Sequence, residues 1–196
     1  MPNLRFAFPV VIFLSISLAA QDRSHFEVFG GYSLERIAPC GVSESGEYPC
    51  NAETGFLAPT TNYNGWDASF TGYFTRFLGA TADFSGHYGP YRFENQVTPP
   101  YPSASRYSYM FGPAFAWRTP KVTPFAHFLL GHTDESLSGS IGNYNVFSWA
   151  VGGGLDVSVR RRIAVRLAQL EYESVHVPGN AAANGLRYSA GVVFRF

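Results

Sequence analysis

Apolar and polar residues alternate strictly along the last twelve residues of this sequence, GLRYSAGVVFRF (185–196). Successive side chains of an extended strand point to opposite faces, so this alternation predicts an amphipathic β-strand. One face would carry Leu186, Tyr188, Ala190, Val192, Phe194 and Phe196, and the other Arg187, Ser189, Gly191, Val193 and Arg195.

The same two-residue period predicts strands over 25–35, 64–75, 80–88, 106–117 and 146–158. Residues 122–132 are apolar in both phases, so their faces stay unassigned. In 163–173 the alternation slips, and a β-bulge near Ala168 would bring Arg166, Gln169 and Glu171 onto one polar face. Pro113 lacks a backbone donor, so a local bulge or weak pairing is expected there.

The connections between these eight strands differ in length. Residues 76–78, 118–121 and 159–162 form short turns, whereas 36–64, 89–105, 133–145 and 174–185 are long and rich in Gly, Pro, Asn and Ser. Short turns at one end and long loops at the other are typical of outer-membrane barrels. We therefore predict an all-β fold, an eight-stranded antiparallel up-and-down transmembrane β-barrel, whose last strand pairs with the first because open edges cannot lie in hydrocarbon.

Composition agrees with one exported β-rich domain. Aromatic residues make up 17% of the chain, and 14 basic residues balance 14 acidic ones, which argues against a nucleic-acid binder. Residues 1–20 contain one arginine and an apolar run that ends in small residues, as in a cleaved secretory signal peptide. An uncleaved anchor is the alternative, but the run is short for a spanning helix. The barrel domain is expected over 21–196.

Alternation alone does not say which face points outward. A soluble barrel would hide its apolar face, whereas an outer-membrane barrel would expose it to lipid. Two sets of aromatic residues on the apolar face favour the membrane arrangement, because bilayers select aromatic belts at both interfaces. The polar face would then fill the interior with charges of both signs that can pair. The predicted interior charges are Glu27, Asp67, Asp83, Arg106, Asp156, Arg166, Glu171, Arg187 and Arg195.

The final strand, YSAGVVFRF, ends on an aromatic residue. In this, and in the pattern of turns and loops, the chain resembles the small bacterial outer-membrane β-barrel family, the OmpA/OmpX-like proteins often described as porin-family, over about residues 24–196. The resemblance implies a monomer in the bacterial outer membrane, in contact with outer-membrane lipid and the barrel-assembly machinery. It also implies that Tyr188, Phe194 and Phe196 form the assembly signal.

The sequence contains only weak motifs for metal binding, cofactor binding or catalysis. Cys40 and Cys50 lie close together and are expected to form a disulfide after export; a zinc site is the alternative, but the stretch holds neither His nor Asp. The five histidines lack metal-ligand spacing, and the glycines of VGGGLD fit close strand packing better than a phosphate loop. No metal, cofactor or catalytic residue is predicted.

The function predicted is a non-enzymatic structural or surface-interaction role, with an extracellular partner bound through the loops. A small-solute porin-like channel is the alternative. A lipid-modifying hydrolase built on Ser85 and His87 is a third possibility, and a soluble ligand-binding barrel a fourth. The run VRRRI (159–163) is predicted to be a solvated turn, with lipid phosphate or a periplasmic partner as its other possible contacts.

Overall fold

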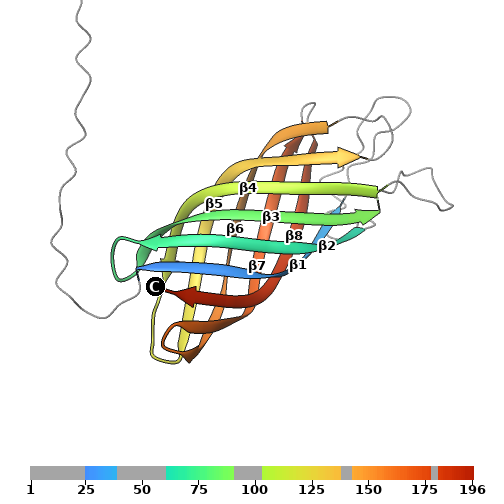
Figure 1. Ribbon diagram of the computed structural model, residues 1–196. Helices are drawn as coiled ribbons and strands as arrows, with labels where there is room; N and C mark the ends of the chain where they lie inside the picture. The colour runs from blue at the N-terminus through green and yellow to red at the C-terminus, as the bar shows by residue number, and fades with distance from the viewer. Residues whose placement is uncertain (1–24, 39–60, 91–102, 138–142, 178–180) are drawn as a thin grey trace, which may run out of the picture.

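Eight antiparallel strands close into one barrel, in which each strand pairs with its neighbours in sequence and β8 pairs with β1 (Figure 1). The structure is a computed structural model that describes residues 25–38, 61–90, 103–137, 143–177 and 181–196. The strands are β1 (Phe26–Ala38), β2 (Thr61–Tyr73), β3 (Leu78–Pro90), β4 (Ser103–Ala116), β5 (Val122–Leu137), β6 (Asn143–Arg160), β7 (Ile163–Val177) and β8 (Ala181–Arg195). The predicted up-and-down barrel is confirmed.

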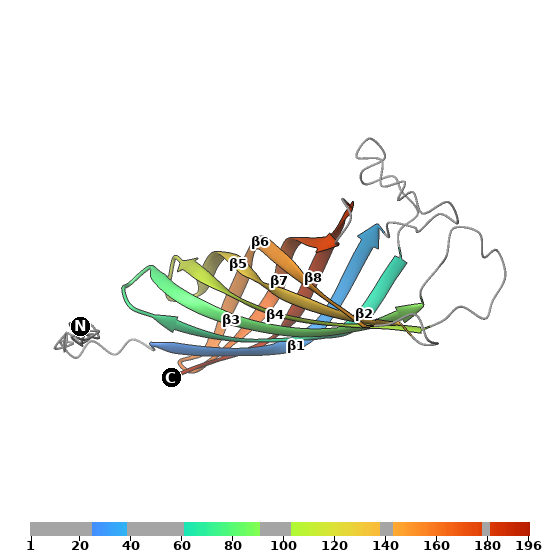
Figure 2. The same cartoon turned by 90° about the horizontal axis from the view of Figure 1, so that it is seen from above.

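The two ends of the barrel differ in how the strands are joined. The connections 74–77, 117–121 and 161–162 lie at the end that also holds the C-terminus, here called the turn end (Figures 1 and 2). Strands leave the opposite end, the loop end, toward the longer connections. Several strands run further than predicted: β6 reaches Arg160, so its turn to β7 is two residues rather than four.

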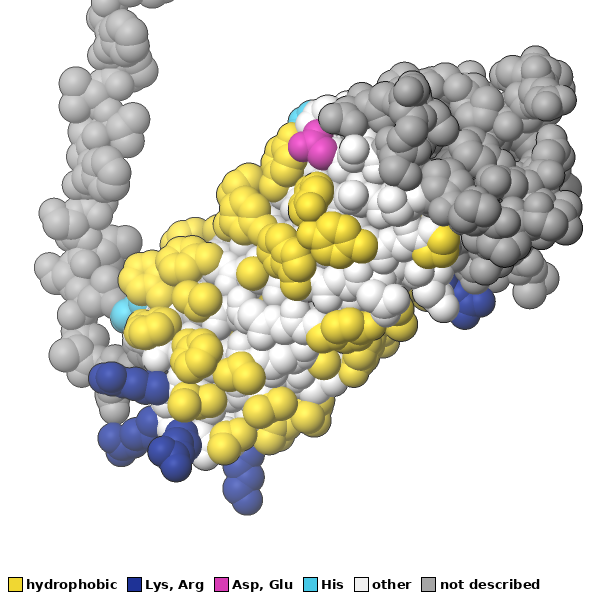
Figure 3. Space-filling view, turned by 45° about the vertical axis from the view of Figure 1, so that its right-hand side comes forward, with side chains coloured by type: hydrophobic (Ala, Val, Ile, Leu, Met, Phe, Trp, Pro, Cys, Tyr) yellow, Lys and Arg dark blue, Asp and Glu magenta, His cyan; other side chains and the backbone are white. Residues whose placement is uncertain are grey.

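The exterior is apolar and the interior polar. Residues of the predicted apolar face point outward, with Tyr32 54%, Phe70 47% and Phe194 47% exposed. Most of the described residues that are buried are polar or charged, and the buried apolar ones form only small clusters. Figure 3 shows the hydrophobic side chains spread along the flank of the barrel. This is the inversion expected of a membrane barrel, and it contradicts the soluble alternative.

A β-bulge interrupts β7 where the alternation slips. Toward β6, Ala168 faces Leu155 and Arg166 faces Asp156, so Leu167 has no partner. Toward β8 the register also shifts between Arg166 and Gln169. The bulge turns Arg166, Gln169 and Glu171 inward together, as all three are buried. The predicted bulge is confirmed, and its extra residue keeps both halves of β7 polar on the inside.

The structure assigns the faces of β5. Thr123, His127 and Leu129 are buried, whereas Phe128 and Leu130 are exposed. Its pairing with β4 stops after Phe111 and resumes at Ala114 with no shift in register. The weak pairing expected at Pro113 is therefore confirmed. No bulge forms, since the register toward β5 is the same on both sides of the gap and Pro113 still lies opposite Ala80 of β3.

Glycines on β6 make room inside the barrel. A Cβ at Gly152 would lie 2.5 Å from Cγ of Glu171, and one at Gly154 would lie 2.8 Å from the ring of Phe125. Both distances are shorter than side-chain contacts allow, so these positions admit only glycine without rearrangement. The run VGGGLD therefore serves close packing around the interior charges, as predicted.

Candidate functional site

The interior of the barrel is the candidate site, because it gathers most of the charged side chains in the described residues. All nine predicted interior charges lie there, and none is more than 8% exposed. They fall into three groups along the barrel axis: a central cluster around Arg187, a turn-end cluster around Arg166 and Glu27, and a loop-end cluster around Arg106. Alternation on separate strands brings them together, since one face of every strand points inward.

Arg187 of β8 is the centre of the first group and is fully buried. Its Nε donates to Glu171 Oε2 at 2.6 Å, and its Nη2 donates to Asp83 Oδ1 at 2.8 Å. Nη1 donates to the Ser85 hydroxyl at 2.7 Å. Glu171 also lies 2.6 Å from Nε2 of His127. One guanidinium thus ties β8 to β7 and, across the barrel, to β3.

Gln169, which the bulge turns inward, joins the central cluster to the turn end. Its amide nitrogen donates to Asp67 Oδ2 at 3.2 Å and to Glu171 Oε2 at 3.0 Å. Its carbonyl oxygen accepts from Nη1 of Arg166 at 2.6 Å. The polar network is therefore continuous along β7.

Arg166 of the turn-end cluster lies between two aromatic rings. Its guanidinium carbon is 4.3 Å from the ring centre of Phe29 and 4.0 Å from that of Phe125. Its Nε and Nη2 donate to the two oxygens of Asp156 at 2.8 and 3.2 Å. The buried cation is therefore stabilised by a carboxylate in its plane and by aromatic faces above and below.

Glu27 binds the other two arginines of the turn-end cluster. Arg118 Nη2 donates to Glu27 Oε1 at 2.7 Å, and Arg195 Nε lies 3.0 Å from the same oxygen. Arg195 Nη2 is 3.6 Å from Asp156 Oδ2, which links this pair to Arg166. Each carboxylate of the turn-end cluster therefore contacts two arginines.

The loop-end cluster is centred on Arg106, which is 3% exposed. Its Nη2 donates to Glu173 Oε1 at 3.1 Å and lies 3.6 Å from Glu35 Oε1. The hydroxyl of Ser108 donates to the same oxygen of Glu173 at 3.3 Å. Glu35 lies 3.5 Å from Nδ1 of His87, which completes a closed group of two carboxylates, one arginine and one histidine.

Ser85 and His87, the residues considered for a hydrolase, do not contact each other. Ser85 binds Arg187, whereas Nε2 of His87 lies 2.9 Å from the hydroxyl of Ser33. Ser33, His87 and Glu35 follow the order of a Ser-His-acid triad, but Ser33 and Glu35 are 0% exposed and His87 is 1% exposed. A lipid substrate would have no route to the Ser33 hydroxyl in this conformation.

Four charged or titratable groups of the network were absent from the sequence prediction. Glu35 and Glu173 share the phase of Glu27 and Glu171 on their strands, so the alternation already contained the signal. His127 lies on β5, whose faces could not be assigned from the sequence. Arg118 belongs to a turn, where alternation gives no direction.

The remaining predicted residues lie elsewhere. Tyr188, Phe194 and Phe196 are 38%, 47% and 66% exposed on the outer face. Cys40 and Cys50 lie outside the described residues, as does the expected signal peptide 1–20. The described ranges hold no group of three or more His, Cys, Asp or Glu arranged for a metal ion. They also contain no helix that is long and apolar enough to span a membrane.

Three solved structures share this architecture. Neisserial surface protein A is 15% identical and covers 88% of this chain and 98% of its own, with a TM-score of 0.63. Outer membrane protein OprG of Pseudomonas aeruginosa is 12% identical over 89% and 97%, with a TM-score of 0.61. Ail, the attachment invasion locus protein of Yersinia pestis, is 16% identical over 89% and 99%, with a TM-score of 0.55.

No protein-family model and no curated protein matches the sequence. The structural likeness shows that the chain has the fold of small outer-membrane β-barrels. Together with the apolar exterior, it supports the predicted location in the bacterial outer membrane.

Proposed function

We propose that this outer-membrane barrel is a rigid, non-enzymatic scaffold that presents its loop-end segments to an external partner. The observation that carries the proposal is the filled interior. Arg187 is fully buried and bonds across the barrel to Asp83, so the wall is braced from within. A stiff wall with variable connections at one end is a common arrangement for binding surfaces.

A small-solute channel is the second candidate and receives less support. Ions would have to pass the Arg187, Glu171 and Asp83 group, in which the arginine is bound to both carboxylates. Opening a path there requires breaking buried ion pairs, which is unfavourable by several kcal/mol. We therefore expect no discrete current steps when the folded barrel is inserted into a planar bilayer. Regular unitary steps would favour the channel.

The charge of the longest connection indicates the chemistry of a partner. Residues 39–60 contain Glu44, Glu47 and Glu53 and no lysine or arginine. Ail has been crystallised in complex with the heparin analogue sucrose octasulfate, a polyanion. The acidic connection of this chain favours a cationic partner instead, because like charges repel.

The test compares the barrel in nanodiscs with a variant in which residues 39–60 are replaced by a short Gly-Ser linker. Wild type should bind polylysine-coated beads and ignore heparin-coated beads, and the linker variant should lose the binding. A triple variant, E44Q/E47Q/E53Q, is the matched control that keeps the length. Equal binding by wild type and both variants would reject the proposed partner class.

The hydrolase alternative has its own test. If Ser33, His87 and Glu35 only brace the interior, His87→Ala should leave the lipid A profile of expressing cells unchanged. Ser33→Ala should behave in the same way. A lipid species that disappears in both variants and is present in wild type would establish an enzyme.

A further inference from the structure

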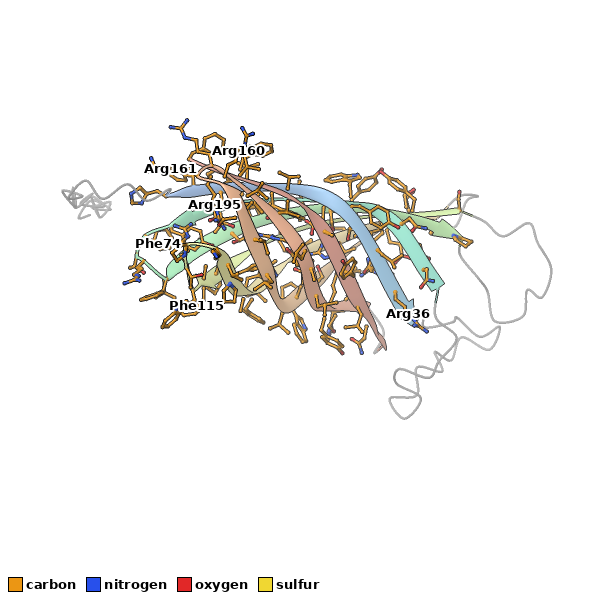
Figure 4. All side chains as sticks on the ribbon, turned by 90° about the horizontal axis from the view of Figure 1, so that it is seen from below. Arg36, Phe74, Phe115, Arg160, Arg161 and Arg195 are labelled. Carbon is orange, nitrogen blue, oxygen red and sulfur yellow. The ribbon has the colours of Figure 1, made fainter. Side chains whose placement is uncertain are left out.

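Two aspartates meet in the centre of the barrel. Asp67 of β2 and Asp83 of β3 are each 1% exposed and lie within hydrogen-bonding range of each other. Asp67 is the middle residue of its strand, about 20 Å from either end, and Asp83 lies at the same level of the neighbouring strand. Figure 4 shows side chains within the space that the strands enclose, as well as on the outer wall. The pair is therefore surrounded by side chains of the barrel strands and is remote from the segments that join them.

Each of the two aspartates has one oxygen with a hydrogen-bond donor and one oxygen without. Asp83 Oδ1 accepts from Nη2 of Arg187 at 2.8 Å, and Asp67 Oδ2 accepts from the side-chain amide of Gln169 at 3.2 Å. Asp67 Oδ1 and Asp83 Oδ2 have no donor. The Ser189 hydroxyl, which also lies near Asp67, donates to another serine at 3.0 Å instead. Carboxylate oxygens that are buried without a donor are unfavourable, because burial removes the water that would bind them.

The charges around the pair do not balance two ionised aspartates. Among the described residues, Arg187 is the cation that binds the pair, and it also binds Glu171, a third carboxylate that acts on both aspartates. His127 contacts Glu171. Even if His127 is counted as a cation, three carboxylates face two cations, which leaves one negative charge in excess.

The other strands bring no further charge to this level. Directly across from the pair, the adjacent strands place uncharged residues, namely Gly31, Ser69, Ser85 and Met110. The interior charges of the other strands belong to the loop-end cluster, with Glu35 of β1, His87 of β3, Arg106 of β4 and Glu173 of β7, and to the turn-end cluster, with Glu27 of β1, Asp156 of β6 and Arg166 of β7.

We propose that Asp67 and Asp83 bind one proton between them, so that the centre of the barrel contains a carboxylic acid paired with a carboxylate. The O–H group of Asp67 Oδ1 donates to Asp83 Oδ2, and this one bond satisfies both oxygens that lack a donor. Asp83 is the ionised partner, because Arg187 binds its other oxygen. Two carboxyl groups in contact away from water share a proton in this way because two adjacent negative charges repel each other. The inference concerns the interior and does not depend on the partner of the loop-end segments.

The bound proton makes the stability of the barrel depend on pH. In the unfolded chain both aspartates are exposed to water and ionised above about pH 4, so the folded barrel binds one proton more than the unfolded chain. Stability falls with rising pH wherever the folded state binds more protons, by up to about tenfold in the folding equilibrium for each pH unit. At alkaline pH the proton is lost, and two like charges then lie side by side on β2 and β3.

The first test is infrared spectroscopy of the folded, full barrel in detergent micelles at neutral pH, with carbon-13 in the aspartate carboxyl groups. The carbonyl stretch of a protonated acid is separate from the carboxylate bands, and the label distinguishes aspartate from glutamate. We expect one protonated aspartate per barrel. The band should disappear in Asp67→Asn and in Asp83→Asn, because the asparagine amide replaces the shared proton as the donor.

Asp156→Asn is the matched control and should keep the band, because both oxygens of Asp156 accept from Arg166. A heat-dependent gel shift verifies that each variant is folded. Absence of the band in wild type would overturn the proposal, as would its persistence in both Asp67→Asn and Asp83→Asn.

The second test follows urea unfolding in lipid vesicles from neutral to alkaline pH. Wild type should lose stability relative to Asp67→Asn, by up to about tenfold in the folding equilibrium for each pH unit, because the variant has no shared proton to lose. The comparison cancels the contributions of the histidines and tyrosines, which both proteins contain. Asp156→Asn should keep the wild-type slope. The same slope in wild type and Asp67→Asn would contradict a proton held by the pair.

Discussion

The two halves of the barrel interior balance their charges differently. The turn-end cluster has three arginines for two carboxylates: Arg118, Arg166 and Arg195 against Glu27 and Asp156. The central and loop-end clusters together have two arginines for five carboxylates: Arg106 and Arg187 against Glu35, Asp67, Asp83, Glu171 and Glu173. The acidic excess therefore lies in the half nearer the loops.

The difference appears in the hydrogen bonds. Both oxygens of Glu35, and one oxygen each of Asp67, Asp83 and Glu173, accept no hydrogen bond from the protein. In the turn-end cluster the oxygens of Glu27 and Asp156 all have donors. Each arginine of the acidic half thus stabilises several carboxylates, whereas each carboxylate of the turn end is shared by several arginines. Loss of an arginine should matter most in the acidic half.

Arg187→Met should have the largest effect. It leaves Asp83 and Glu171 buried without their main cation, and removing one partner of such a pair typically costs about 3 to 5 kcal/mol of unfolding free energy. Urea unfolding in lipid vesicles, followed by tryptophan fluorescence, measures the change. The triple variant R187M/D83N/E171Q should recover a large part of the loss. An unchanged urea midpoint in Arg187→Met would contradict the proposed dependence of the acidic half on its few arginines.

Arg166→Met in the turn-end cluster should lose less, about 2 kcal/mol. Asp156 keeps Arg195 nearby, and methionine can occupy the space between Phe29 and Phe125. The same unfolding assay compares it with Arg187→Met. If both substitutions lowered stability equally, sharing of arginines would not protect the turn end.

Glu27→Gln should lower the unfolding free energy by about 1 kcal/mol. It weakens two arginine contacts at once, but Arg195 keeps Asp156 and the Ser158 hydroxyl. Because the turn end is rich in arginine, removing a negative charge there is unfavourable. A gain in stability would contradict the assigned charge balance.

Glu35→Gln should have the smallest effect and the opposite tendency, from no change to a gain of about 1 kcal/mol. Neither oxygen of Glu35 accepts a hydrogen bond, and Arg106 keeps Glu173 at 3.1 Å. Glu173→Gln is the matched control and should be destabilising, because Glu173 accepts bonds from Arg106 and Ser108. A marked loss in Glu35→Gln would show that the acidic half has no surplus charge.

Much of the architecture follows from the sequence because strand alternation is a local property. The inward or outward direction of the side chains from Leu186 to Arg195 of β8, and of Phe196 after it, follows from the alternation. The bulge in β7 was also readable, since polar residues on a lipid face would be unfavourable. The same rule places Glu35 and Glu173, the last residues of the predicted strands 25–35 and 163–173, on the inner face.

The pairing of charges could not be predicted in the same way. Arg187 reaches Asp83 across the barrel, and Arg166 meets the ring of Phe29 from another strand. Such contacts depend on strand tilt and stagger, which set which residues share a level inside the barrel. The sequence shows that these side chains point inward but contains no local signal for their partners.

Leu167, which has no partner on β6, is an extra residue that shifts the alternation of β7 by one position. The first half of the strand carries Arg166, and the second half carries Gln169, Glu171 and Glu173. Without the extra residue, all four would follow one uninterrupted two-residue alternation. A deletion of Leu167 would therefore leave every interior charge in place. A deletion of Leu170 would instead turn toward lipid either Gln169, if the bulge is lost, or Glu171 and Glu173, if the bulge is kept. Length changes in this strand are thus tolerated at the bulge and disruptive away from it.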